Sequence, residues 1–133
     1  MEIKEYKEFK LKEIFNLYEK VLWTNYTENI EMLTDSYKNS LYIAGAYEND
    51  KLVGIVRVVG DGHSIVYVQD IIVLPEYQRN KIGTKLLKHI IEKYKNVYQM
   101  ILTTDNTEKT KKFYESLGFK DLYELDCKSF MKI

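Results

Sequence analysis

Residues 70–87 (DIIVLPEYQRNKIGTKLL) constrain the fold more than any other part of this 133-residue chain. They include the end of an apolar, β-branched run over Ile65–Val73 that predicts a strand, which Pro75 ends. From Ile82 onward, apolar residues recur at helical spacing, so the sequence predicts a helix after a short polar loop. A further strand is predicted at 97–102, and a strand–helix–strand crossover makes its two strands parallel.

The start of that helix has the physical properties of an anion site. Free backbone N–H groups point outward at a helix N-terminus, and the helix dipole favours negative charge there. The polar loop just before it contains Arg79 and Asn80, and Gly83 follows within the first turn. We interpret the predicted anion as a pyrophosphate, and the alternative is an ordinary polar loop that only caps the helix.

The remaining apolar patterns predict a mixed α/β sheet of the α+β type, mostly antiparallel, with helices on both faces. No linker, repeat or low-complexity tract divides the chain, so we expect a single domain over residues 1–133. Further strands are predicted at 2–7, 41–47, 52–59, 119–124 and 127–132, and further helices at 11–22, 30–37 and 107–117.

Composition and charge exclude several classes of function. Lys+Arg and Asp+Glu both number 20, and a net charge of zero argues against a nucleic-acid binder. No apolar run is long enough to cross a membrane, and the charged N-terminus lacks a signal-peptide core, so we expect a cytoplasmic protein. The single Cys127 excludes an intrachain disulfide and a Cys-based zinc cluster, and we expect no metal site.

Several short motifs occur in a fixed order on the predicted elements. They are Val53-Gly54, Val73-Leu74-Pro75, Gln78-Arg79-Asn80-Lys81-Ile82-Gly83, Asn106, Phe113-Tyr114 and Gly118-Phe119. In this order and spacing they resemble the GNAT superfamily of N-acetyltransferases over residues 41–119. The acetyl-CoA loop of that family usually reads Gln/Arg-x-x-Gly-x-Gly/Ala, after a strand ending in Val-x-Pro.

The resemblance implies a GNAT-like acyl-CoA N-acyltransferase fold, and acetyl-CoA as the acetyl donor. It implies an N-acetyltransferase that moves the acetyl group to a primary amine by direct attack in a ternary complex. The small size and many aromatic residues favour a small-molecule amine, and we expect a monomer or homodimer. A non-catalytic acyl-CoA-binding sensor or interaction module is the alternative.

The resemblance also assigns cofactor-binding residues. The strand backbone would hydrogen-bond the pantetheine arm, and an N–H near Val73 would polarise the acetyl carbonyl. Asn106 would bind the cofactor, or cap the helix that carries Tyr114, or do both. The full predicted set is Ile71, Ile72, Val73, Gln78, Arg79, Asn80, Lys81, Ile82, Gly83, Thr84, Asn106 and Phe113.

One residue departs from the pattern of the family. Lys81 stands where the family usually has the first glycine of its loop. A lysine would be strained there if the backbone required a positive φ, whereas an ordinary helix start would tolerate a side chain. An ammonium group at this position could also face the phosphates of the ligand.

Two residues are predicted to act in catalysis. Tyr114 would donate a proton to the departing CoA thiolate, and its alternative role is that of a packing aromatic in a helix face. Asp70 is the only carboxylate in Ile65–Val73, and it would be the base or the amine anchor, especially if a bulge re-aims it. Structural pairing with Arg57 is the alternative for Asp70, and a water relay is a third route for the proton.

Aromatic residues could line the pocket of the acceptor, where their flat faces suit an arylalkylamine or another apolar amine. The alternative is that they are plain core or rim residues. The candidates are Trp23, Tyr26 and Tyr77.

Overall fold

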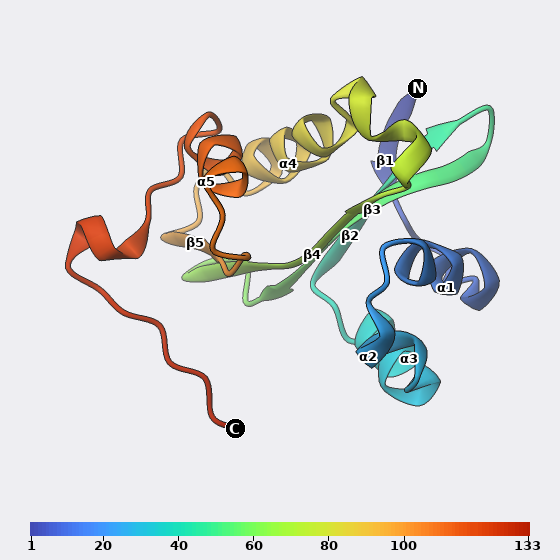
Figure 1. Ribbon diagram of the computed structural model, residues 1–133, viewed down its shortest axis with the longest axis horizontal. Coiled ribbons are helices and arrows are strands. Elements are labelled where there is room, and N and C mark those ends of the chain that lie inside the picture. The colour runs from blue at the N-terminus through green and yellow to red at the C-terminus, as the bar shows by residue number, and fades with distance from the viewer. The chain divides into compact units, whose positions relative to one another are not determined.

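The computed structural model describes all 133 residues, and they form two compact units, Met1–Leu102 and Thr103–Ile133. The first unit is built on a five-stranded sheet in the order β1-β2-β3-β4-β5 (Figure 1). Three neighbouring pairs are antiparallel and β4–β5 is parallel, so the predicted mixed, mostly antiparallel sheet is confirmed. The strands are β1 (Glu2–Glu5), β2 (Tyr42–Glu48), β3 (Lys51–Gly60), β4 (Ile65–Val73) and β5 (Gln99–Leu102).

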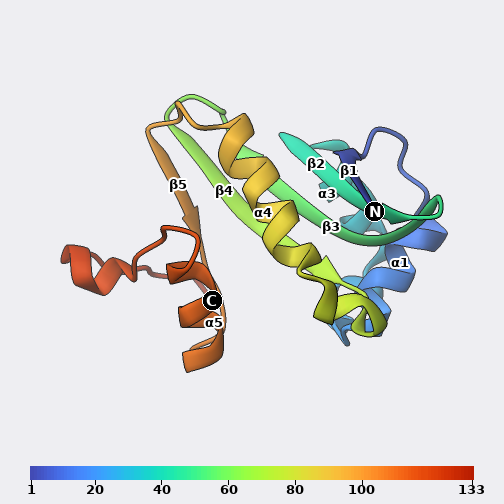
Figure 2. The ribbon, with the colours of Figure 1, turned by 90° about the horizontal axis from the view of Figure 1, so that it is seen from above.

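Helices cover both faces of this sheet, as predicted (Figures 1 and 2). One face carries α1 (Leu11–Lys20), the single-turn α2 (Thr24–Thr27) and α3 (Ile30–Lys38). The opposite face carries α4 (Ile82–Lys93), which links β4 to β5. Helices α1, α3 and α4 each bury apolar residues, and this burial is the main source of their stability. The fully buried helix residues are Ile14, Leu17, Tyr18, Leu33, Ile82, Leu86, Leu87 and Ile90.

A β-bulge in β4 decides which way its side chains point. Arg57 pairs with Asp70, but the next β3 residue, Val58, pairs with Val68, so Gln69 is an extra residue in β4. Residues that pair across two strands share a face, and an inserted residue reverses the alternation beyond it. Val68 therefore faces α4, whereas Asp70 faces α1–α3. The bulge thus re-aims Asp70, which the sequence analysis considered as one possibility.

Gly54 in β3 permits a close approach of β4 and α4. A Cβ at this position would lie 2.9 Å from the carbonyl oxygen of Ile72 and 3.3 Å from Cδ1 of Leu86. No larger residue fits without moving the backbone of β4. Gly54 thus allows β4 and α4, which flank the polar loop in the sequence, to pack at a short distance.

The second unit contains α5 (Glu108–Glu115) and a 3-10 helix, η2 (Leu122–Leu125). The strands predicted at 119–124 and 127–132 are wrong, because no residue beyond β5 is in a strand. The Asp121 side chain accepts a hydrogen bond from the N–H of Tyr123, and Asp126 has a φ of 63°. These aspartates turn the chain locally, and such local hydrogen bonds compete with a sheet ladder. None of the helices in either unit is both long and apolar enough to cross a membrane.

Candidate active site

The second half of β4 has one edge that pairs with no strand. The parallel pairing with β5 covers only Ile65–Val68 and ends at Leu102. The following residues of β4 continue to pair with β3 on their other side, up to Val73. Backbone N–H and C=O groups on the free edge can therefore bond an extended ligand. Ile71, Ile72 and Val73, which were predicted to bind the cofactor arm, lie on this stretch.

The free edge leads directly into the predicted anion loop. A 3-10 helix, η1 (Pro75–Asn80), follows β4, and Lys81 then begins α4 as its N-cap. No side chain caps α4, so its first N–H groups have no internal acceptor. The side chains of Arg79 and Lys81 are exposed beside them. The structure thus brings the strand and loop residues of the predicted set into one continuous stretch, from Ile71 to Thr84.

Lys81 adopts a left-handed backbone conformation, with φ 56° and ψ 28°. The position therefore has the positive φ that favours glycine, and the strained alternative of the sequence analysis is confirmed. Gln78 stabilises the turn from outside, because its Nε2 donates a hydrogen bond of 3.1 Å to the carbonyl of Val73. This hydrogen bond stabilises the loop and leaves the start of α4 open.

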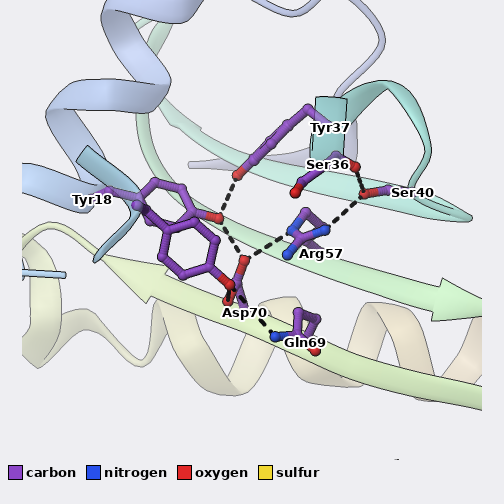
Figure 3. A network of polar contacts seen from close by, with 8 residues as sticks. Tyr18, Ser36, Tyr37, Ser40, Arg57, Gln69 and Asp70 are labelled. Atoms are coloured by element: carbon purple, nitrogen blue, oxygen red, sulfur yellow. Dashed lines mark hydrogen bonds and ion pairs between the residues drawn. The ribbon is translucent and has the colours of Figure 1, made fainter. Parts of the chain in front are cut away.

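Asp70 lies in a buried polar network on the α1–α3 face of the sheet (Figure 3). Its Oδ2 accepts hydrogen bonds from Nε of Arg57 at 2.8 Å and from the hydroxyl of Tyr18 at 2.7 Å. Its Oδ1 accepts a bond of 3.1 Å from the hydroxyl of Tyr26. Arg57 also donates to Oγ of Ser40 at 3.2 Å. The pairing with Arg57 that was one interpretation of Asp70 is present, and a catalytic role for Asp70 stays a prediction.

The directions of these hydrogen bonds follow from the number of protons. Tyr18 has one hydroxyl proton, which it donates to Asp70, so Tyr37 is the donor in the 3.0 Å contact between the two tyrosines. Burial raises the pKa of Tyr18 and of Tyr37, and the charge of Asp70 adds to both shifts. Burial alone would lower the pKa of Arg57, but the charge of Asp70 outweighs it and raises that pKa. At neutral pH the phenols of Tyr18 and Tyr37 are therefore neutral and the guanidinium of Arg57 is charged.

Two of the three predicted pocket aromatics lie at this network. The ring of Tyr26 lies 4.8 Å from that of Tyr18, and the ring of Trp23 lies 6.4 Å from that of Tyr26. Both Trp23 and Tyr26 are partly exposed. Tyr77 makes a different contact, with Nζ of Lys51 5.7 Å from its ring centroid. Sequence reasoning placed Tyr18 only in an apolar helix face, because no local pattern reveals a partner 52 residues away.

The predicted site residues of the second unit lie on and just before α5. The ring of Tyr114 lies 5.0 Å from that of Phe113 and 6.0 Å from that of Phe119. Burial raises the pKa of Tyr114, although a hydrogen bond with the Thr104 side chain opposes the shift. The N-cap of α5 is Thr107, whose side chain accepts from the N–H of Thr110. The capping role considered for Asn106 is therefore wrong, and its cofactor role stays a prediction.

No group of three or more His, Cys, Asp and Glu side chains is arranged to hold a metal ion. The ionisable groups of the network are instead paired with each other, and every buried side-chain nitrogen and oxygen has a hydrogen-bond partner. The candidate site therefore consists of a free strand edge, an open helix start and a satisfied polar network beside them.

Comparisons with known proteins identify relatives of the chain. The acetyltransferase (GNAT) family matches residues 8–119. A solved GNAT-family acetyltransferase from Streptococcus pneumoniae is 44% identical, with a TM-score of 0.90, over 99% of this chain and 96% of that chain. A Gibberella zeae protein, named as a candidate acetyltransferase, is 32% identical over 77 residues. That match spans 56% of this chain but only 42% of the relative.

The fold is also shared with a more distant structure that was solved with a ligand. AAC(6′)-Iy, in complex with the bisubstrate analogue CoA-S-monomethyl-acetylneamine, has a TM-score of 0.70 at 18% identity. The match covers 90% of each chain. At this identity the likeness shows the fold alone.

Proposed function

Because this chain belongs to the acetyltransferase (GNAT) family and is thus an acetyltransferase that uses an acyl-CoA, we propose that acetyl-CoA is its donor and a small-molecule primary amine its acceptor. The two substrates bind together in a ternary complex, and the amine attacks the thioester directly. One observation carries the proposal: the free edge of β4 at Ile71–Val73 continues into the uncapped start of α4. This arrangement suits an extended thioester arm that ends in a diphosphate.

Each part of acetyl-CoA has residues that suit it. The first N–H groups of α4, at Ile82, Gly83 and Thr84, bind the diphosphate, and Arg79 and Lys81 add positive charge. The backbone of the free β4 edge bonds the pantetheine arm, and the N–H near Val73 polarises the acetyl carbonyl. The residues that complete the proposed cofactor set are Gln78, Asn80, Asn106 and Phe113.

The proposed reaction forms one bond and breaks another. The amine reaches the site mostly protonated, since its pKa is about 10, and it loses one proton to water. Its nitrogen then bonds to the thioester carbon, the C–S bond breaks, and a second proton leaves the nitrogen for water. Tyr114 donates its hydroxyl proton to the departing sulfur and regains a proton from solvent. Asp70 acts on the amine only indirectly, because both its oxygens already accept hydrogen bonds from neighbouring side chains.

The proposal is tested by ligand-induced stabilisation and by thiol release. Acetyl-CoA should raise the melting temperature, because a ligand that binds the native state stabilises it. Mixing acetyl-CoA with phenethylamine, spermidine, lysine methyl ester or kanamycin should then release free thiol. Stabilisation by CoA without thiol release from any of these amines would favour the non-catalytic sensor.

A charge variant tests the anion site itself. Thr84→Glu places a carboxylate in the first turn of α4, where it favours the helix but repels a diphosphate. We expect this variant to keep its melting temperature and to lose the shift caused by acetyl-CoA. Ser129→Glu is the matched control, because it adds the same charge at an exposed position outside the proposed site. An unchanged shift in Thr84→Glu would remove the helix start from the binding site.

A further inference from the structure

Of the three side chains that hydrogen-bond Asp70, only Tyr26 is partly exposed. Tyr18 is fully buried, Arg57 is 5% exposed and Asp70 is 3% exposed, whereas Tyr26 lies in the single-turn α2 and is partly exposed. As the ion-pair partner of Arg57, Asp70 is a carboxylate and only accepts hydrogen bonds. The single proton of Tyr26 is therefore committed to Oδ1 of Asp70, 3.1 Å away.

Because its one proton is used in this hydrogen bond, the oxygen of Tyr26 can only accept further hydrogen bonds. The other polar atom near it is Nε2 of Gln69 at 3.5 Å, which is the outer limit of a hydrogen bond (Figure 3 shows Gln69 at the edge of the network). A hydroxyl that donates to a carboxylate becomes a stronger acceptor, because the bond polarises its oxygen. Tyr26 thus offers an electron-rich oxygen that attracts N–H donors and repels anionic groups.

The Tyr26 oxygen bonds Asp70, which adjoins the stretch of β4 that the proposed reaction uses. Asp70 directly precedes Ile71–Val73, the β4 stretch whose free edge is assigned to the thioester arm. We propose that Tyr26 accepts a hydrogen bond from the attacking amine, with Asp70 as the residue that orients it, and this inference rests on the proposed function. Trp23, whose ring centroid lies 6.4 Å from that of Tyr26, supplies an apolar wall. The acceptor is thus a primary amine on an apolar or aromatic body, with no carboxylate next to the amine.

Phenethylamine and phenylalanine form a matched pair of probes, because they differ only in the carboxylate beside the amine. With acetyl-CoA in excess, phenethylamine should be acetylated with the higher kcat/KM. Tyr26→Phe should raise the KM for phenethylamine about tenfold, within the range expected for the loss of one hydrogen bond. The kcat and the KM for acetyl-CoA should stay unchanged, which a purely structural role of the hydroxyl would not produce.

Tyr42→Phe is the control for removing a hydroxyl. Tyr42 is partly buried and bonds Nε2 of His89 at 2.8 Å, on the α4 face of the sheet. This variant should keep the KM for phenethylamine. An unchanged KM in Tyr26→Phe would overturn the assignment of Tyr26.

The remaining outcomes separate the two proposals. Equal use of phenylalanine, or thiol release only with spermidine, lysine methyl ester or kanamycin, would overturn the acceptor class and leave the proposed function standing. The absence of thiol release with every amine would overturn both.

Discussion

Nε of Arg57 lies 2.8 Å from Oδ2 of Asp70, and these are the only two charged residues that the fold buries. They pair across β3 and β4 at the bulge, so the ion pair sits where the alternation of β4 reverses. A lone charge in this position would be costly, whereas the pair is compensated by two tyrosine hydroxyls and Ser40. The two residues should therefore act as a unit in stability.

A double-mutant cycle measures this coupling. Arg57→Met and Asp70→Leu should each lower the free energy of unfolding by about 3–5 kcal/mol, because each leaves the other charge buried and unpaired. The double variant should lose clearly less than the sum of the two single losses. Urea unfolding of the four proteins gives the values. Additive losses would show that the two charges do not depend on each other.

Leu22, at the end of α1, offers a stabilising substitution. Its φ is 63°, its N–H donates to the carbonyl of Glu19, and the N–H of Trp23 donates to that of Tyr18. This is a Schellman ending with a leucine in the position that glycine prefers. Leu22→Gly should raise the free energy of unfolding by about 0.5–1 kcal/mol, since the left-handed strain removed exceeds the added chain entropy.

Leu22→Ala is the control for that substitution. The side chain of Leu22 is 80% exposed, so trimming it removes little packing. Alanine keeps the left-handed strain, and urea unfolding should therefore show no gain for this variant. Equal gains in the two variants would mean that the exposed side chain, and not the backbone, limits stability.

The sequence predicted those parts of the fold that local patterns determine. Helical periodicity and Pro75 located α4 and the end of β4, and a polar turn located the β2–β3 hairpin, where Asn49 and Asp50 have positive φ. The sequence does not locate the bulge at Gln69, because strand register depends on the partner strand. The contact of Tyr18 with Asp70 gives no sequence signal, since it joins elements that only the folded chain brings together.

Lys81 combines backbone strain with a charge beside the proposed diphosphate site. Lys81→Ala removes the charge and keeps the strain, whereas Lys81→Gly removes both. Glycine should therefore exceed alanine by about 1 kcal/mol in the free energy of unfolding, measured with urea. Both variants should weaken CoA binding about equally, by a few-fold, because both lose the ammonium group. Unchanged CoA affinity in calorimetry would show that the ammonium does not face the phosphates.

Tyr114 is the proposed proton donor, and its pKa is raised by burial. A raised pKa keeps the phenol protonated below pH 10, so kcat should show no alkaline decline between pH 7 and about 9. Tyr114→Phe should lower kcat at least about 100-fold, the lower end of what a general acid typically contributes, while the acetyl-CoA-induced shift in melting temperature persists. Tyr123→Phe is the control, since Tyr123 is 79% exposed and should leave kcat unchanged. Equal kcat in Tyr114→Phe and the unmodified chain would show that the thiolate takes its proton from another donor.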